Sequence, residues 1–103
     1  MASRASIEFD FHKAKAQADK LDSIADQLSR LADSKFGNTM QHLSSNWKGE
    51  NASLYLDKGG RLQEQMDGTA GELHSIASDI RAIARRIYEA EMNALRIAEQ
   101  REY

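Results

Sequence analysis

The sequence predicts an all-α protein, in which an antiparallel helical hairpin pairs with a second hairpin to form a four-helix bundle. The 103 residues include no proline, the residue that most often interrupts helices. Apolar residues recur at spacings of three and four over two long stretches of the chain. Between these stretches lies one cluster of serine, asparagine and glycine. Residues 1–103 are therefore expected to form a single hairpin domain.

The first helix is expected over residues 10–45. The alternation from Ile7 to Phe9 favours an extended start, and Asp10 can then cap the helix because its carboxylate accepts from the free N–H groups of the first turn. One apolar stripe runs along this helix, with a four-residue stutter before its last part: Phe11, Ala14, Ala18, Leu21, Ala25, Leu28, Ala32, then Phe36, Met40, Leu43 and Trp47.

The turn is expected over residues 46–50, where Trp47 and Gly49 stand out. Gly49 suits a chain reversal beside a bulky ring, because glycine readily takes a positive φ. An indole is costly to expose, so Trp47 must pack on something. Two roles stay open for this side chain: a cap on the end of the bundle, or an exposed aromatic anchor for a docking partner.

The second helix is expected over residues 51–100. Its interior glycines, Gly59, Gly60, Gly68 and Gly71, allow either a close approach of two helices or a bend. A heptad register typical of a coiled coil continues through them. Its positions are Ala52, Tyr55, Gly59, Leu62, Met66, Thr69, Leu73, Ile76, Ile80, Ile83, Ile87, Ala90, Ala94 and Ile97.

Both helices carry more apolar residues than the strip between two rods can cover. Ile24 and Leu31 lie off the main stripe of the first helix, and Leu54 and Leu56 flank that of the second. A dimer solves this problem by burying the remainder, whereas a monomer would have a frayed distal half. The expected hairpin and dimer core is Leu21, Leu28, Leu62, Met66, Leu73, Ile76, Ile80 and Ile83.

Composition and motifs argue against catalysis and against several ligand classes. The net charge of −2 disfavours a nucleic-acid partner, and the absence of cysteine excludes thiolate chemistry. His12, His42 and His74 lack the spacing of a helical metal site and are expected to be solvated. No apolar stretch is long enough for an integral membrane segment. We therefore expect a non-enzymatic protein without a cofactor or metal.

The turn and its surroundings resemble a known family. Trp47-Lys48-Gly49 lies at the centre of a chain of about a hundred residues with a helix on each side, and a small residue and an aromatic–aliphatic pair follow it at Ala52, Tyr55 and Leu56. This combination resembles the WXG100 family, the small Trp-x-Gly proteins of type VII secretion. The resemblance covers nearly the whole chain.

The resemblance implies a helical hairpin that forms a homodimer, or a heterodimer with a related small helical protein. It implies synthesis in the cytoplasm and secretion by a membrane ATPase without a cleaved signal peptide; the apolar core of such a peptide is also missing from the N-terminus. Family members act as secreted substrates, and some escort a larger effector toxin. Trp47 and Gly49 would then be the partner-docking motif.

The family's usual C-terminal export signal is Tyr, three residues, then Asp or Glu. After Tyr88, the acidic residue Glu91 comes one position too early. A second form is a hydrophobic residue, three residues, an acidic residue, two residues, a hydrophobic residue, three residues and a last hydrophobic residue, and Ile87, Glu91, Ala94 and Ala98 satisfy it. Either this signal is a variant, or a partner supplies the signal.

Two other functions remain open from the sequence. The chain could be an intracellular helical-hairpin module that assembles complexes and has no role in secretion. It could also be membrane-active, if Phe9, Phe11, Phe36 and Ile24 formed one exposed patch.

Overall fold

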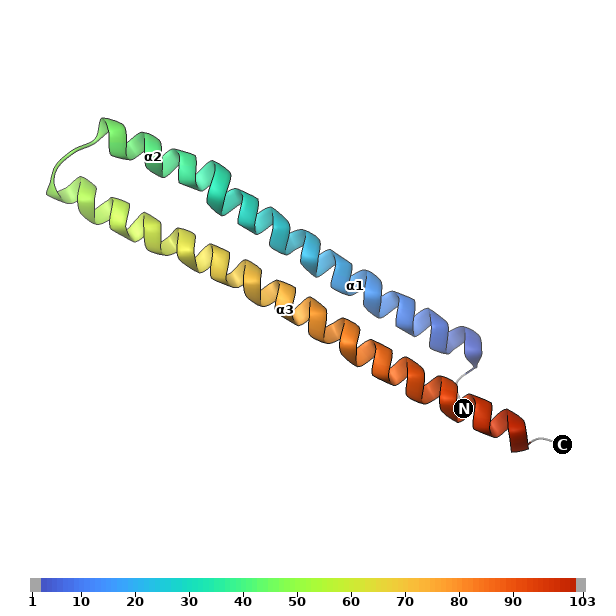
Figure 1. Cartoon of the computed structure of the whole chain (residues 1–103). Helices are drawn as coiled ribbons and strands as arrows, with labels where there is room; N and C mark the ends of the chain where they lie inside the picture. Colours follow the sequence, from blue (N-terminus) through green and yellow to red (C-terminus); the bar gives the residue numbers. More distant parts are fainter. Residues whose placement is uncertain (1–2, 102–103) are drawn as a thin grey trace. The chain divides into compact units, whose positions relative to one another are not determined.

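The computed structural model describes residues 3–101, and these residues form helices with no strand. Helix α1 spans Arg4–Arg30, a π-helix η1 spans Leu31–Phe36, α2 spans Gly37–Asn46 and α3 spans Glu50–Arg101 (Figure 1). The prediction of an all-α protein with a hairpin arrangement of two long helical arms is confirmed. No helix within residues 3–101 has an apolar stretch that could cross a membrane.

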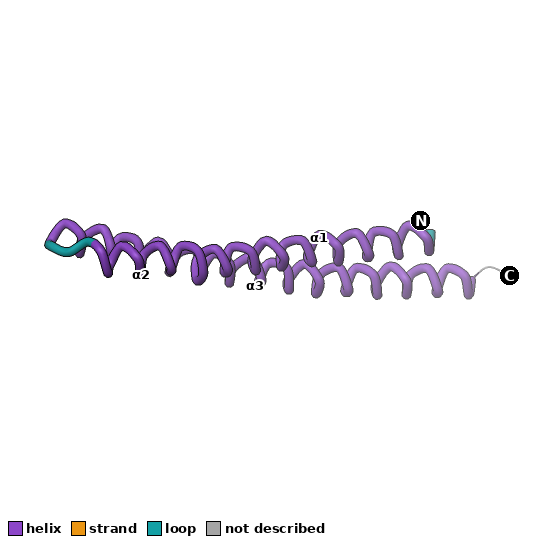
Figure 2. The backbone as a smooth tube through the Cα atoms, turned by 90° about the horizontal axis from the view of Figure 1, so that it is seen from above, coloured by secondary structure: helices purple, strands orange, loops and turns teal. Residues whose placement is uncertain are grey.

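The chain divides into two compact units, which we describe separately. The turn unit runs from Asp22 to His74 and contains the chain reversal. The terminal unit combines the residues up to Leu21 with those from Ser75 onward. In the turn unit, α2 lies beside the first part of α3 in both Figure 1 and Figure 2.

Helix α1 begins at Arg4, so the prediction of an extended segment at Ile7–Phe9 with an N-cap at Asp10 is wrong. Ser3 caps the helix instead: its Oγ accepts a hydrogen bond from the Ser6 N–H at 3.2 Å, and its carbonyl accepts from the Ile7 N–H at 3.0 Å. Ile7 lies four residues before Phe11 and is 2% exposed. One further turn of helix therefore buries one further large side chain.

The π-helix η1 lies where the apolar stripe shows its stutter. Four residues of an α-helix overshoot a full turn by about 40°, so repeated four-residue steps carry a stripe around the helix. The stripe takes such steps from Ala32 to Phe36 and to Met40. In η1 the Gly37 N–H donates to the Ala32 carbonyl, five residues back, which widens the turn. Ala32 stays fully buried, and Phe36 and Met40 stay half-buried.

The seams between the helices consist mainly of alanine. In the turn unit the buried side chains are Ala25, Ala32, Ala52 and Ala70. In the terminal unit they are Ile7, Ala18, Ala77 and Ala84. No large side chain among the described residues is fully buried. Small side chains let two helix backbones come close together, but they remove little apolar surface from water.

The predicted core residues separate into two groups. Leu21, Leu28, Met66, Leu73 and Ile80 are half-buried along the seams. Leu62, Ile76 and Ile83 lie outside the seams and are about half exposed, at 47%, 48% and 51%. The next residue along the chain takes the seam position in each case: Gln63 is half-buried, and Ala77 and Ala84 are buried. At these three positions of α3, the residue that packs against the other arm is therefore the one that follows the predicted residue.

Helix α3 continues through all four of its glycines, so none of them breaks or bends it out of helical geometry. A β-carbon added to Gly59 would overlap the Met40 side chain, whereas one added to Gly60, Gly68 or Gly71 would meet no atom within 4 Å. The interpretation that glycine allows a close helix approach therefore holds at Gly59 only.

Candidate functional site

The chain reversal is built by Trp47, Lys48 and Gly49. Trp47 ends α2 in an extended conformation (φ −128°, ψ 120°), and its N–H donates to the Leu43 carbonyl at 2.9 Å. Gly49 has a φ of 122°, a value that side-chain-bearing residues rarely adopt. Its carbonyl accepts from the Ser53 N–H at 3.0 Å and so begins α3. The predicted reversal at Trp47 and Gly49 is therefore found, with the backbone geometry that favours glycine.

Side chains before the turn close the carboxyl end of α2. Ser44 Oγ donates to the Gln41 carbonyl at 2.8 Å, and Ser45 Oγ donates to the His42 carbonyl at 2.9 Å. These hydroxyls satisfy carbonyl groups near the helix end, where intrahelical partners run out. The carboxyl end of α2 is therefore held by local hydrogen bonds from these hydroxyls and from the Trp47 N–H, and these bonds do not involve the indole ring.

The Trp47 ring packs on Tyr55 of α3 and remains partly open to solvent. The two ring centroids are 5.5 Å apart with an interplanar angle of 26°, which is a stacked arrangement. Trp47 is 41% exposed and Tyr55 is 61% exposed. We call Trp47 and Tyr55 the aromatic pair. Stacking fixes the indole in one orientation while it leaves apolar surface free, as an anchor for a partner requires.

Each unit has an apolar flank beside its alanine seam. In the turn unit this flank is formed by Ile24, Leu31 and Leu62, and in the terminal unit by Ile76, Ile83 and Ile87. All six side chains are between 45% and 52% exposed. At about 100° of rotation per residue, these positions lie on the side of the seam opposite to the polar bridges of the same unit.

The polar bridge of the turn unit is centred on His74. Its Nδ1 lies 2.6 Å from Asp22 Oδ1, and its Nε2 lies 3.2 Å from Asp26 Oδ1. The hydrogen bond to Asp22 is the main cause of a raised pKa at His74, and the negative charges of Asp22 and Asp26 add to it while partial dehydration opposes it. The expectation that all three histidines are simply solvated is wrong for His74.

The polar bridge of the terminal unit joins Arg81 to Asp19. Arg81 Nη2 donates to Asp19 Oδ1 at 2.6 Å. Both bridges connect residues more than 50 positions apart in the sequence. Sequence reasoning missed them because neither partner stands within a helical turn of the other. A signal did exist, since Asp19, Asp22 and Asp26 recur on one side of α1 at spacings of three and four.

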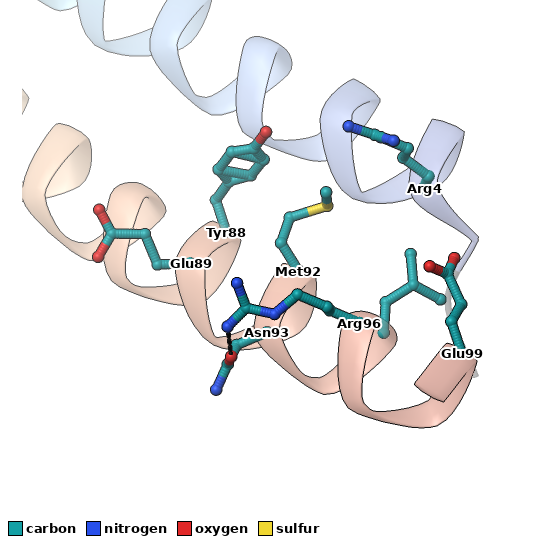
Figure 3. A pocket seen from close by; sticks show the side chains of 8 residues that line it. Arg4, Tyr88, Glu89, Met92, Asn93, Arg96 and Glu99 are labelled. Carbon is teal, nitrogen blue, oxygen red and sulfur yellow. Dashed lines mark hydrogen bonds between the residues drawn. The ribbon is translucent and has the colours of Figure 1, made fainter. Parts of the chain in front are cut away.

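The candidate export signal lies on α3 in the terminal unit. Ile87 and Ala94 are exposed, and Glu91 and Ala98 are half-buried. Their spacing places these four residues along one strip of the helix. Tyr88 faces α1, where its ring stacks on Phe11 with centroids 4.6 Å apart and an interplanar angle of 12°. Figure 3 shows Tyr88 and Met92 directed toward α1, beside Arg4.

Within residues 3–101, no three His, Asp or Glu side chains are arranged to hold a metal ion. The shallow hollow of Figure 3 is lined by side chains of both charge signs, among them Arg4, Glu89, Arg96 and Glu99. The residues of the structure that stand out are thus the aromatic pair, the apolar flanks and the polar bridges.

In comparisons with known proteins, no family model, no curated protein and no solved structure matches this chain. Its function is therefore inferred from its own residues.

Proposed function

We propose that this protein is a small substrate or adaptor of a type VII secretion system, similar to WXG100 proteins. It is made in the cytoplasm, exported as a folded helical dimer, and acts through protein–protein contact without catalysis. The observation that carries the proposal is the Trp47-Lys48-Gly49 turn, which holds a partly exposed indole on Tyr55 at a helical reversal. A larger effector toxin is a further partner that such an adaptor would escort.

The apolar flanks support the dimer. Among residues 3–101, the buried residues are seven alanines and Ile7, whereas twelve large apolar side chains are at least 41% exposed. Burying one half-exposed isoleucine or leucine contributes about 1 kcal/mol, roughly half of the value for complete burial. Several such residues beside one seam favour association with a second hairpin, since that partner removes them from water. This partner is a second copy or a related small helical protein.

The environment of the polar residues supports a non-enzymatic role. His74, Asp22 and Arg81 are engaged in bridges between helical arms. General acid–base catalysis places such groups against a substrate in a concave site. The membrane-active alternative is weakened because Phe11 and Phe36 are half-buried along the seams, so they do not belong to one exposed patch with Phe9.

The proposal is tested by measuring the protein in culture supernatant, with and without the export ATPase. We expect wild-type protein to accumulate outside only when the ATPase is present. Trp47→Ala should lower export at least about tenfold, because a hot-spot aromatic contributes about 2 kcal/mol or more to docking. Its loss should lower the free energy of unfolding by only about 1 kcal/mol, since the indole is 41% exposed.

Phe9→Ala is the matched control, because Phe9 is also an exposed aromatic, at 66%, but lies far from the turn in sequence. It should leave export unchanged. Retention of the wild-type protein inside cells regardless of the ATPase would favour the intracellular assembly module. Normal export of Trp47→Ala would remove the docking role of the turn.

A further inference from the structure

The bridge at His74 has a geometry that a neutral histidine cannot satisfy. One ring nitrogen faces Asp22 at 2.6 Å and the other faces Asp26 at 3.2 Å. An ionised carboxylate only accepts hydrogen bonds, and a neutral imidazole carries one N–H. Only the imidazolium can donate to both carboxylates at once. Deprotonation would therefore turn one of the two contacts into a lone pair facing a negative charge.

The carboxylates and the histidine come from opposite arms of the turn unit. Asp22 and Asp26 stand one turn apart on α1, and His74 is on α3. The bridge spans the seam beside Ala25 and Ala70, which are buried and contribute little apolar surface. Because the small side chains of the seam contribute little, a charge-assisted contact supplies a larger share of the stability that holds the two arms together than it would beside a core of leucines.

We propose that His74, Asp22 and Asp26 form a proton-operated clamp between α1 and α3, closed when His74 is protonated and loosened when it is neutral. The residues one turn away on α3 are uncharged: Ala70, Gly71, Ala77 and Ser78. The ionisable groups next along the two helices are Asp19 with its partner Arg81, and Arg30 and Asp67.

The direction of the pH effect follows from the raised pKa of His74. The folded protein binds the imidazole proton more tightly than the unfolded chain does, so the clamp contributes its full stability below the ordinary histidine value of 6.5. This contribution is lost as the pH rises through the folded-state pKa. Acidification therefore tightens the turn unit, and mildly alkaline conditions loosen it.

The test uses the full chain and two readouts. NMR titration should give the His74 imidazole a pKa above the ordinary histidine value of 6.5. Amide hydrogen exchange, corrected for the intrinsic rate at each pH, should show protection in residues 22–30 falling several-fold between pH 5.5 and pH 8.5.

Two variants separate the clamp from general pH effects. His74→Gln keeps a polar side chain without the titrating group, and it should abolish the pH dependence of protection in residues 22–30. His42→Gln should behave like the wild type. The clamp is refuted if His74 titrates at or below the ordinary histidine value of 6.5, or if His74→Gln retains the wild-type pH dependence. Asp26→Asn should reduce the pH dependence of protection by half or more, because it removes the negative charge of the second carboxylate.

Discussion

At the scale of single residues, the polar side of the turn unit contains a repulsive contact between Asp67 and Asp33 in addition to the attractive bridge at His74. The carboxyl of Asp67 on α3 has a raised pKa, caused first by partial loss of hydration and then by its hydrogen bond to Asp33 of η1 and the negative charge there. Two carboxylates this close favour sharing a proton. The negative charge of Asp33 therefore disfavours ionised Asp67 beside it, and this repulsion opposes the packing of η1 against α3.

We expect Asp67→Asn to stabilise the protein at pH 7, because the amide keeps the shape of the side chain and can donate to Asp33. The melting temperature should rise, and the gain should disappear as the pH falls below the ordinary carboxyl range. The sign follows from linkage: a raised folded-state pKa means that stability is present below the unfolded value of 3.8 and is lost as the pH rises through the folded value.

The measurement for Asp67→Asn is thermal unfolding followed by circular dichroism from pH 3 to pH 8. Asp57→Asn is the control, since Asp57 is exposed on the same helix and no contact of its side chain is described. It should leave the melting temperature unchanged. A melting temperature for Asp67→Asn that is equal to or below the wild-type value at pH 7 would show that the contact with Asp33 is not repulsive.

The residues of the turn were predictable from the sequence, and those of the polar bridges were not. Trp47 and Gly49 belong to one local signal, in which a glycine with positive φ follows a bulky ring by two positions. His74 gains its role only from the register that sets α3 against α1, 52 positions away from Asp22. Periodicity predicts which face of a helix is apolar, but it does not fix how two faces are aligned along their length.

At the scale of elements, the periodicity of apolar residues predicted both helical arms. It placed the larger apolar residues in the seam between the arms, where the structure has alanines. The closest approach of two helices selects small side chains, so Ala77 and Ala84 occupy the seam while Ile76 and Ile83 flank it. Because isoleucine is more hydropathic than alanine, a hydropathy pattern places the seam at Ile76 and Ile83, one residue before the alanines that form it. The start of α1 was missed for a similar reason, because the short cap at Ser3 is a weaker signal than the carboxylate of Asp10.

Within α3, the glycines offer a test of how the element is packed. Gly60→Ala and Gly71→Ala should each raise the free energy of unfolding by about 0.5–1 kcal/mol, since an added methyl group meets open space and alanine has the higher helix propensity. Gly59→Ala should gain less or lose stability, because Met40 must move to make room.

Urea denaturation of the three glycine variants measures this difference directly. Equal stabilisation by all three would mean that Met40 does not occupy the space beside Gly59. Destabilisation by Gly60→Ala would mean that another chain covers this part of α3, since no atom of the hairpin lies there.

At the scale of the whole molecule, the main feature is that the apolar flanks are exposed in the single hairpin. The alanine seams bury little surface per residue, and the large side chains beside them stay about half exposed. In the proposed dimer, the second hairpin would bury these side chains, and association would then stabilise the fold. The aromatic pair at the turn is also partly exposed, at 41% for Trp47 and 61% for Tyr55.

The purified protein should therefore have twice the chain mass of 11.6 kDa in light scattering on a sizing column. Ile83→Glu should raise the dissociation constant at least about tenfold, because each copy loses about 1 kcal/mol of apolar burial and gains an unpaired charge at the interface. Ser78→Glu is the control, since Ser78 is exposed on the opposite side of the α3 seam. A monomeric wild type, or equal dissociation constants for Ile83→Glu and Ser78→Glu, would show that this flank is not where the second hairpin binds.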